Sequence, residues 1–176
     1  MANTFFIADT HFGHEATCTK FTRNDGSPLR PFADADEMDE HLVTKWNSVV
    51  RPQDKVYHLG DITMGRKGKA LNIFYRLNGD KVLIKGNHDT LPIKNYLEHF
   101  RDIRAVHQFE GMILSHIPIH PDSLARWGHN IHGHTHANSM FVNSKLDNRY
   151  ICVSVEQINY TPISLEEVRK IIKDQK

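Results

Sequence analysis

Short apolar runs alternate with amphipathic stretches along this chain of 176 residues. Residues 4–8, 55–59 and 81–85 are runs of this kind, and each is followed by polar residues or glycine. Such runs are typical of buried strands. Their alternation with helical patterns predicts an α/β fold.

The second half of the chain adds further predicted strands. Residues 103–109 and 112–115 flank Glu110-Gly111, so we expect them to form a hairpin that delivers His116 at its far end. Residues 131–132 and 150–155 predict two more strands.

Helical spacing is clearest over residues 34–49, where Asp34 can serve as the N-cap and Glu37 completes a capping box. The apolar stripe of this helix consists of Met38, Leu42, Trp46 and Val49. Shorter helices are predicted at residues 70–77 and 93–100. The polar stretch between residues 18 and 31 predicts a long loop.

The last predicted helix opens with a second capping box, formed by Ser164 and Glu167. It turns Val168, Ile171 and Ile172 inward. We find no internal repeat and no linker, so the pattern predicts one domain over residues 1–176.

Composition narrows the range of functions. The formal net charge is +1, which argues against a general nucleic-acid binder, and the short basic run at residues 66–69 is expected to be a solvated loop. No segment approaches membrane-spanning length. The two cysteines, Cys18 and Cys152, form no paired motif, so we expect a reduced, cytoplasmic protein. The oligomeric state stays open.

Histidine is in excess, with 13 residues in the chain, and an excess of this size points to metal binding or proton transfer. Polar clusters directly follow the predicted strands. These clusters are Asp9-Thr10-His11, Gly60-Asp61, Gly86-Asn87-His88-Asp89 and Gly133-His134-Thr135-His136. Because open α/β sheets bind ligands at the carboxyl ends of their strands, we expect the clusters to converge on one two-metal site for phosphate-ester hydrolysis.

The ordered series of these motifs, with Ser115-His116 between the third and the fourth, resembles the calcineurin-like metallophosphoesterases. The likeness is greatest to their short, stand-alone members from bacteria and bacterial viruses, and it runs from residue 9 to residue 136. It implies a four-layer α/β/β/α sandwich, in which two mixed sheets pack face to face with helices outside.

The resemblance also implies a dinuclear metal centre. One ion would be held by Asp9, His11 and His136, the other by Asn87, His116 and His134, and Asp61 would bridge them. His88 would bind no metal and would act as the general acid. Manganese, iron, zinc, nickel and cobalt all suit such nitrogen and oxygen ligands.

Elementary chemistry independently favours these residue types. Two divalent ions about 3.5–4 Å apart repel each other, and a shared carboxylate with a bridging hydroxide relieves the repulsion. Two carboxylates and one hydroxide leave the pair of ions with a charge of about +1, because histidine and Asn87 are neutral ligands. A small phosphate ester such as a nucleotide is the expected substrate, and a phosphodiester is favoured over a phosphoprotein.

Met64 stands where the protein serine/threonine phosphatases of the superfamily carry an aspartate, which argues against phosphoprotein substrates. Asp89 either supports a ligand or caps the following turn. His14 either touches the substrate phosphate or is a solvated loop residue, and Trp127 either stacks on a nucleobase or covers the edge of the sandwich. A metal-binding interaction scaffold without catalysis is the alternative function.

Overall fold

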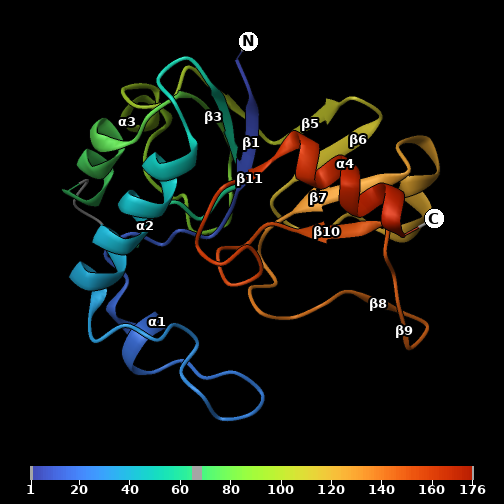
Figure 1. The fold of residues 1–176 in the computed structure, drawn as a ribbon, viewed down its shortest axis with the longest axis horizontal. Helices are drawn as coiled ribbons and strands as arrows, with labels where there is room; N and C mark the ends of the chain where they lie inside the picture. Colours follow the sequence, from blue (N-terminus) through green and yellow to red (C-terminus); the bar gives the residue numbers. More distant parts are fainter. Residues whose placement is uncertain (1, 65–68, 176) are drawn as a thin grey trace.

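The computed structural model describes residues 2–64 and 69–175, which form a mixed α/β fold around two β-sheets (Figure 1). The first sheet contains, in spatial order, β11 (Ile163–Ser164), β1 (Thr4–Ile7), β2 (Lys55–His58), β3 (Asp80–Ile84) and β4 (Asp102–Arg104). Strands β1 to β4 are parallel, and β11 is antiparallel to β1.

The second sheet contains, in spatial order, β10 (Tyr150–Cys152), β7 (His129–His132), β6 (Met112–Ser115) and β5 (Val106–Phe109). Its first three strands are parallel, while β5 and β6 form an antiparallel hairpin. A small separate hairpin joins β8 (Phe141–Val142) to β9 (Lys145–Leu146).

The helices lie outside these sheets. In chain order they are α1 (Glu15–Thr19), α2 (Ala35–Val49), the 3₁₀ helix η1 (Lys69–Arg76), α3 (Ile93–Leu97), the 3₁₀ helix η2 (Pro121–Arg126) and α4 (Leu165–Asp174). Helices α2 and α3 lie on the same side of the first sheet, and α4 lies beside β7 and β10 (Figure 1). None of the helices in the described ranges has the length and apolar character needed to cross a lipid bilayer.

Strand β1 shows how the core is divided. Phe5 and Ile7 pack in a cluster with α2, whereas Phe6 and Ala8 pack in a second cluster with residues of both sheets. Alternate residues of a strand point to opposite faces, so an unbroken apolar run is what a strand buried on both faces requires.

The predicted strands at residues 4–8, 55–59, 81–85 and 150–155 are confirmed to within a few residues at their ends, and so is the helix at 34–49. The Asp34 carboxylate accepts a hydrogen bond from the backbone N–H of Glu37 at 2.8 Å. Glu37 itself accepts from the N–H of Ala33, so the first capping box is only half formed. The second box, at Ser164 and Glu167, is complete.

Two predictions from the sequence were wrong. The run at 103–109 is not one strand, because β4 pairs with β3 and β5 pairs with β6, so the chain changes sheets at Ala105. Residues 18–31 are not entirely loop, since the single-turn helix α1 buries Cys18. One helical turn is too short to show a periodic pattern. The basic stretch from Arg66 to Gly68 lies outside the described residues.

The two sheets meet where β1 ends. The backbone N–H of Ala8 donates to Val153 O at 2.8 Å, and the N–H of Val155 donates to Ala8 O at 3.1 Å. These bonds place Asp9, which follows β1, beside the segment that follows β10. The polar motifs of both sheets therefore open onto a common edge.

Candidate metal centre

The loops that carry the predicted ligands have an unusual backbone conformation. Five predicted ligands have positive φ angles: Asp9 (57°), His11 (46°), Asp61 (55°), His134 (70°) and His136 (50°). The left-handed region costs a non-glycine residue about 1–2 kcal/mol and is concentrated at functional sites. Surrounding packing must therefore hold these loops in place.

The first group of side chains, here called the inner cluster, consists of Asp9, His11 and His136. Each offers one ligand atom, and these atoms all lie within 4.8 Å of one another. Asp9 and His11 are buried and His136 is half-buried. The distance from His11 Nε2 to Asp9 Oδ1 is 3.9 Å.

The second group, here called the outer cluster, consists of Asp61, His116 and His134, with ligand atoms again within 4.8 Å of one another. His134 is exposed, whereas Asp61 and His116 are buried. Asn87, also exposed, places its Oδ1 2.9 Å from His116 Nε2. The structure therefore brings all seven predicted ligands to one edge of the two sheets.

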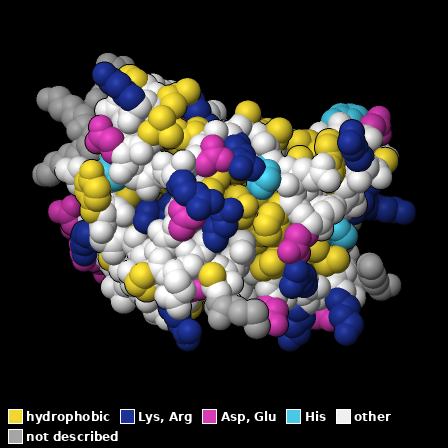
Figure 2. All heavy atoms as spheres, turned by 90° about the horizontal axis from the view of Figure 1, so that it is seen from above, with side chains coloured by type: hydrophobic (Ala, Val, Ile, Leu, Met, Phe, Trp, Pro, Cys, Tyr) yellow, Lys and Arg dark blue, Asp and Glu magenta, His cyan; other side chains and the backbone are white. Residues whose placement is uncertain are grey.

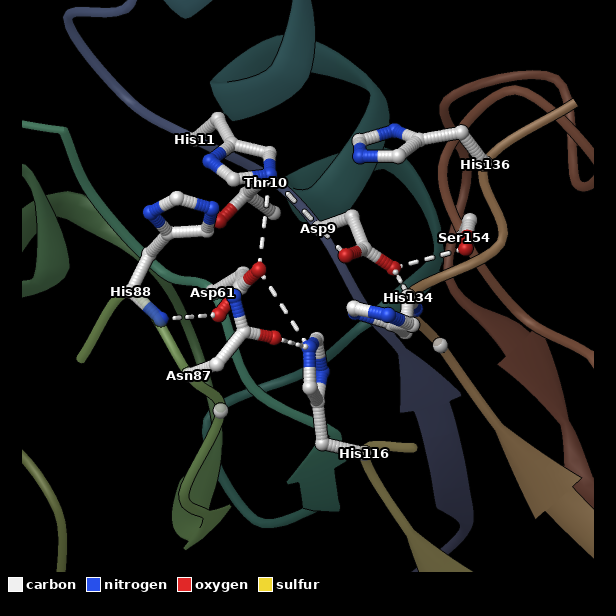
Figure 3. Close-up of polar contacts among 12 residues, drawn as sticks. Asp9, Thr10, His11, Asp61, Asn87, His88, His116, His134, His136 and Ser154 are labelled. Atoms are coloured by element: carbon white, nitrogen blue, oxygen red, sulfur yellow. Dashed lines mark hydrogen bonds and ion pairs between the residues drawn. The ribbon is translucent and has the colours of Figure 1, made fainter. Parts of the chain in front are cut away.

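One carboxylate oxygen stands between the two clusters (Figure 3). Asp61 Oδ2 is 3.7 Å from His11 Nε2 of the inner cluster and 3.2 Å from His116 Nε2 of the outer cluster. The backbone N–H of His88 donates to the other oxygen, Asp61 Oδ1, at 2.8 Å. Asp61 is thus held in an orientation that suits a bridging ligand.

The donor atoms fit cations. His116 Nδ1 lies 2.8 Å from the carbonyl oxygen of Leu59, which can only accept, so Nδ1 carries the proton. In the neutral ring the Nε2 lone pair then faces two oxygens, Asn87 Oδ1 and Asp61 Oδ2. Three acceptors that converge in this way are satisfied by a bound cation or, in the metal-free site, by a proton on Nε2: burial acts to lower the pKa of His116, but the hydrogen bond to Asp61 and the nearby carboxylates raise it.

An unpartnered carboxylate oxygen in the inner cluster also indicates a cation site. Asp9 Oδ1 is buried and has no hydrogen-bond partner among the described residues. A buried carboxylate oxygen without a partner is strongly destabilising unless a cation balances it. Nitrogen and oxygen donors without thiolate suit borderline and hard divalent ions.

The two central carboxylates of the metal-free site, Asp9 and Asp61, have very different pKa values. Burial raises the pKa of Asp9 to about 6, although His136 and His116 offset part of the rise. Burial also acts to raise the pKa of Asp61, but the hydrogen bond and charge of His116 outweigh it and hold that pKa at about 2. A proton therefore competes with a cation more strongly at Asp9.

Three residues that the sequence analysis missed support the inner cluster. Glu156 Oε1 accepts from His136 Nδ1 at 3.0 Å and from Arg30 Nε at 2.8 Å. The fully buried Arg30 guanidinium also donates to the backbone carbonyls of Asp9 and Thr10. Ser154 donates its hydroxyl to Asp9 Oδ2 at 2.6 Å.

The contact between Glu156 and His136 determines which ring nitrogen of His136 can bind a metal. A carboxylate on Nδ1 fixes the His136 tautomer and leaves Nε2 as the ligand atom, as in many metal sites. Glu156 directly follows the predicted strand at residues 150–155, so the rule that found the other motifs was sufficient to find it. Ser154 falls inside that predicted strand, which in the structure ends at Cys152. Arg30 lies in a polar loop, and no local signal distinguishes it.

Asp89 supports the site through the backbone. Its carboxylate accepts from the N–H groups of Gly86, Asp61 and Ile62 at 2.7–3.0 Å and so ties two motif loops together. Of the two roles considered for Asp89, support of the ligands is the one found. A Cβ on Gly60 would lie 2.6 Å from the nitrogen of Gly86, so these loops approach too closely for a side chain.

His88 and His14 flank the inner cluster. Their ring centroids lie 5.5 Å and 5.4 Å from that of His11, and the His88 side chain is exposed. His14 is therefore close to the centre rather than simply solvated. Trp127 packs instead against the cluster of Ile113, Leu124 and Tyr150, which agrees with the covering role considered for it.

Comparisons with known proteins identify relatives over nearly the full length. The chain is 39% identical, over an alignment 184 positions long, to "Uncharacterized protein MJ1445" of Methanocaldococcus jannaschii, and the alignment covers 100% of this chain and 94% of the relative. It is 29% identical to "Gene 66 protein" of Mycobacterium phage L5, over 89% of this chain and 87% of the phage protein.

A solved structure shares the fold. The crystal structure of the protein of unknown function AQ665 from Aquifex aeolicus superposes with a TM-score of 0.73 and 31% sequence identity, covering 97% of this chain and 100% of that chain. No protein-family model matches the chain.

Proposed function

The chain belongs to the family of the uncharacterized protein MJ1445 of Methanocaldococcus jannaschii, and we propose that it is a hydrolase of phosphate esters that depends on two divalent metal ions. The proposal includes the four-layer α/β/β/α arrangement of the calcineurin-like metallophosphoesterases. The apolar cluster shared by the two sheets supports it, as does the packing of α2 on the other face of the first sheet.

The position of Asp61 is the observation that carries the proposal. One oxygen of this carboxylate lies within 3.7 Å of a ligand nitrogen from each cluster. A single-ion site would not need a carboxylate between two separate sets of donors. Two ions that share a ligand form the arrangement that recurs in enzymes of phosphoryl transfer and hydrolysis.

Two bound divalent ions would neutralise the phosphoryl oxygens and activate a water molecule as the nucleophile. Asp61 holds the two half-sites together, and Glu156 keeps the Nδ1 proton of His136 in place. The exposed imidazole of His88 lies beside His11, where a ring nitrogen can donate a proton to the departing alkoxide.

Charge favours an anionic ester. Asp9 and Asp61 are the only carboxylates within the two clusters, and the remaining ligands in the described site are neutral. Two divalent ions with these ligands keep a net positive charge, which attracts phosphate. Glu156 does not reverse this balance, because Arg30 pairs with it.

A general nuclease is less well supported. The face shown in Figure 2, which lies at the end where β1 begins and away from the metal centre, carries basic and acidic side chains interspersed, with no continuous basic track over the residues drawn in colour. The formal net charge of +1 agrees with that distribution. Binding along a nucleic-acid backbone depends on clustered Lys and Arg.

Hydrolysis of bis(p-nitrophenyl) phosphate with manganese tests the proposal, with a chelator as the first control. Asp61→Asn should abolish most turnover and reduce the bound metal. Asp122→Asn is the matched control, because its side chain is 93% exposed and belongs to neither cluster. We expect the control to retain wild-type turnover and metal content.

Two outcomes would contradict the proposal. Turnover that survives complete removal of metal would exclude the assigned chemistry. Complete inertness towards phosphate mono- and diesters, with two ions demonstrably bound, would favour the interaction scaffold instead.

A further inference from the structure

A cleft of about 690 Å³ opens directly beside the two clusters. One wall is the loop from Phe21 to Leu29, and the other is the segment from His134 to Asn138. The volume is within the range of about 300–1,000 Å³ typical of small-molecule sites. Since His134 and His136 belong to both the clusters and the cleft, a molecule in the cleft reaches the metal centre.

The first wall is held in shape by its own hydrogen bonds. The N–H of Leu29 donates to Phe21 O and the N–H of Arg23 donates to Ser27 O, both at 2.8 Å. The Asp25 carboxylate accepts from the backbone and hydroxyl of Ser27. The loop therefore presents its side chains without needing to fold around a ligand.

Phe21 is the apolar surface of this wall. Its side chain lines the cleft although the residue is 47% exposed. Its ring meets His14 edge to face, with centroids 5.6 Å apart, and His14 in turn adjoins His11. An exposed aromatic ring fixed beside a polar centre is suited to stack on a planar group.

Two amide side chains cross the cleft next to this ring. Asn24 Nδ2 lies 3.5 Å from Asn138 Oδ1, the longest distance that a hydrogen bond allows, so the pair opens at little cost. Amides offer a donor and an acceptor side by side, which matches the edge of a nucleobase. Arg23 and Asp25 contribute one charge of each sign to this wall of the cleft. This wall therefore does not favour a strongly charged group on the ligand.

We propose that the cleft binds the nucleoside of a nucleotide ester. The base stacks on Phe21, its edge meets Asn24 and Asn138, and the phosphate lies at the metal centre. This inference rests on the proposed function, because it assigns the organic part of the same substrate.

The experiment compares two diesters with the same leaving group, thymidine 5′-(p-nitrophenyl) phosphate and methyl p-nitrophenyl phosphate. The wild-type protein should prefer the thymidine ester in kcat/KM. Phe21→Ala should lower that preference about 5- to 150-fold, mainly through KM, since one base–aromatic stack contributes about that factor. Phe141→Ala is the matched control, because Phe141 is 62% exposed on β8 and does not line the cleft.

A wild-type protein without preference for the thymidine ester would overturn the assignment while leaving hydrolysis intact, and so would an unchanged preference in Phe21→Ala. If neither ester is hydrolysed, the proposed function fails, and calorimetric titration of the metal-loaded protein with thymidine 5′-phosphate tests the cleft alone. Binding that is weakened in Phe21→Ala and kept in Phe141→Ala then supports the cleft, whereas no binding overturns it.

Discussion

The inner and outer clusters are built on different supports. In the inner cluster, His136 is held by Glu156, whose partner Arg30 is fully buried, and Asp9 is held by Ser154. In the outer cluster, His116 is held by a main-chain carbonyl, and both His134 and the adjoining Asn87 are exposed. The inner cluster thus depends on the buried Arg30–Glu156 pair from distant segments, and the outer cluster depends on main-chain contacts of the motif loops that Asp89 ties together.

This difference suggests a division of roles. Buried carboxylates with fixed partners hold a cation firmly, because few other arrangements satisfy them. The outer cluster shares the buried Asp61 but adds the exposed neutral ligands His134 and Asn87, which bind less tightly and leave the ion open to substrate. We therefore expect the inner cluster to retain its ion and the outer cluster to face the ester, with His88 beside both.

The largest expected effect is on kcat in a His88 variant, and it distinguishes loss of catalysis from loss of bound metal. His88→Ala should lower kcat about 10²- to 10⁴-fold on an ester with a poor leaving group, because a general acid contributes about that factor. Both ions should remain, as measured by metal analysis. His120→Ala is the control, since that side chain is 74% exposed and belongs to neither cluster. Unchanged turnover of this ester would remove His88 from the role.

The second prediction tests the support of the inner cluster. Glu156→Gln should weaken the affinity for one ion about 10- to 100-fold, because it removes the negative charge behind His136. Manganese titration followed by calorimetry measures the effect. Glu40→Gln breaks an exposed pair with Arg76 and should leave affinity unchanged. Equal loss at both ions would refute the proposed difference between the clusters.

The third prediction concerns pH. Folding raises the pKa of Asp9 from 3.8 to about 6, so the metal-free folded state takes up a proton as the pH falls through about 6. That proton competes with metal. Protonation of Asp9 alone should make the affinity about tenfold lower at pH 5 than at neutral pH, and the metal-induced rise in Tm about 3–6 °C smaller. Protonation of His116 and His136, whose pKa values are also raised, acts in the same direction. Thermal scans with and without manganese at both pH values check this, and an equal rise at both would contradict it.

The smallest effect is expected at the outer cluster. Asn87→Asp adds a negative charge at an exposed position, where a unit charge about 4 Å away changes an interaction by about 1 kcal/mol. KM for a phosphate ester should rise about fivefold, while the metal binds more tightly. Steady-state kinetics with parallel metal titration measures both. A lower KM would contradict the argument from charge.

Much of the fold was predictable because its signals are local. The apolar run of β1 and the cap at Asp34 depend only on neighbouring residues. The division of residues 103–109 between two sheets was not predictable, because both halves mix apolar and polar residues with no turn signal between them, and the pairing partners are distant in sequence. Helix α1 was missed because a single turn is too short to show the helical repeat of apolar residues.

The sequence by itself determined which polar side chains follow the strands, because strand ends and glycine turns are encoded within a few residues. Only the tertiary structure decided that these side chains form two adjoining clusters with Asp61 between them. The same holds for Arg30 and Glu156, which are 126 positions apart and meet through packing. Contacts between distant segments follow from how the sheets pack together, and no local pattern records them.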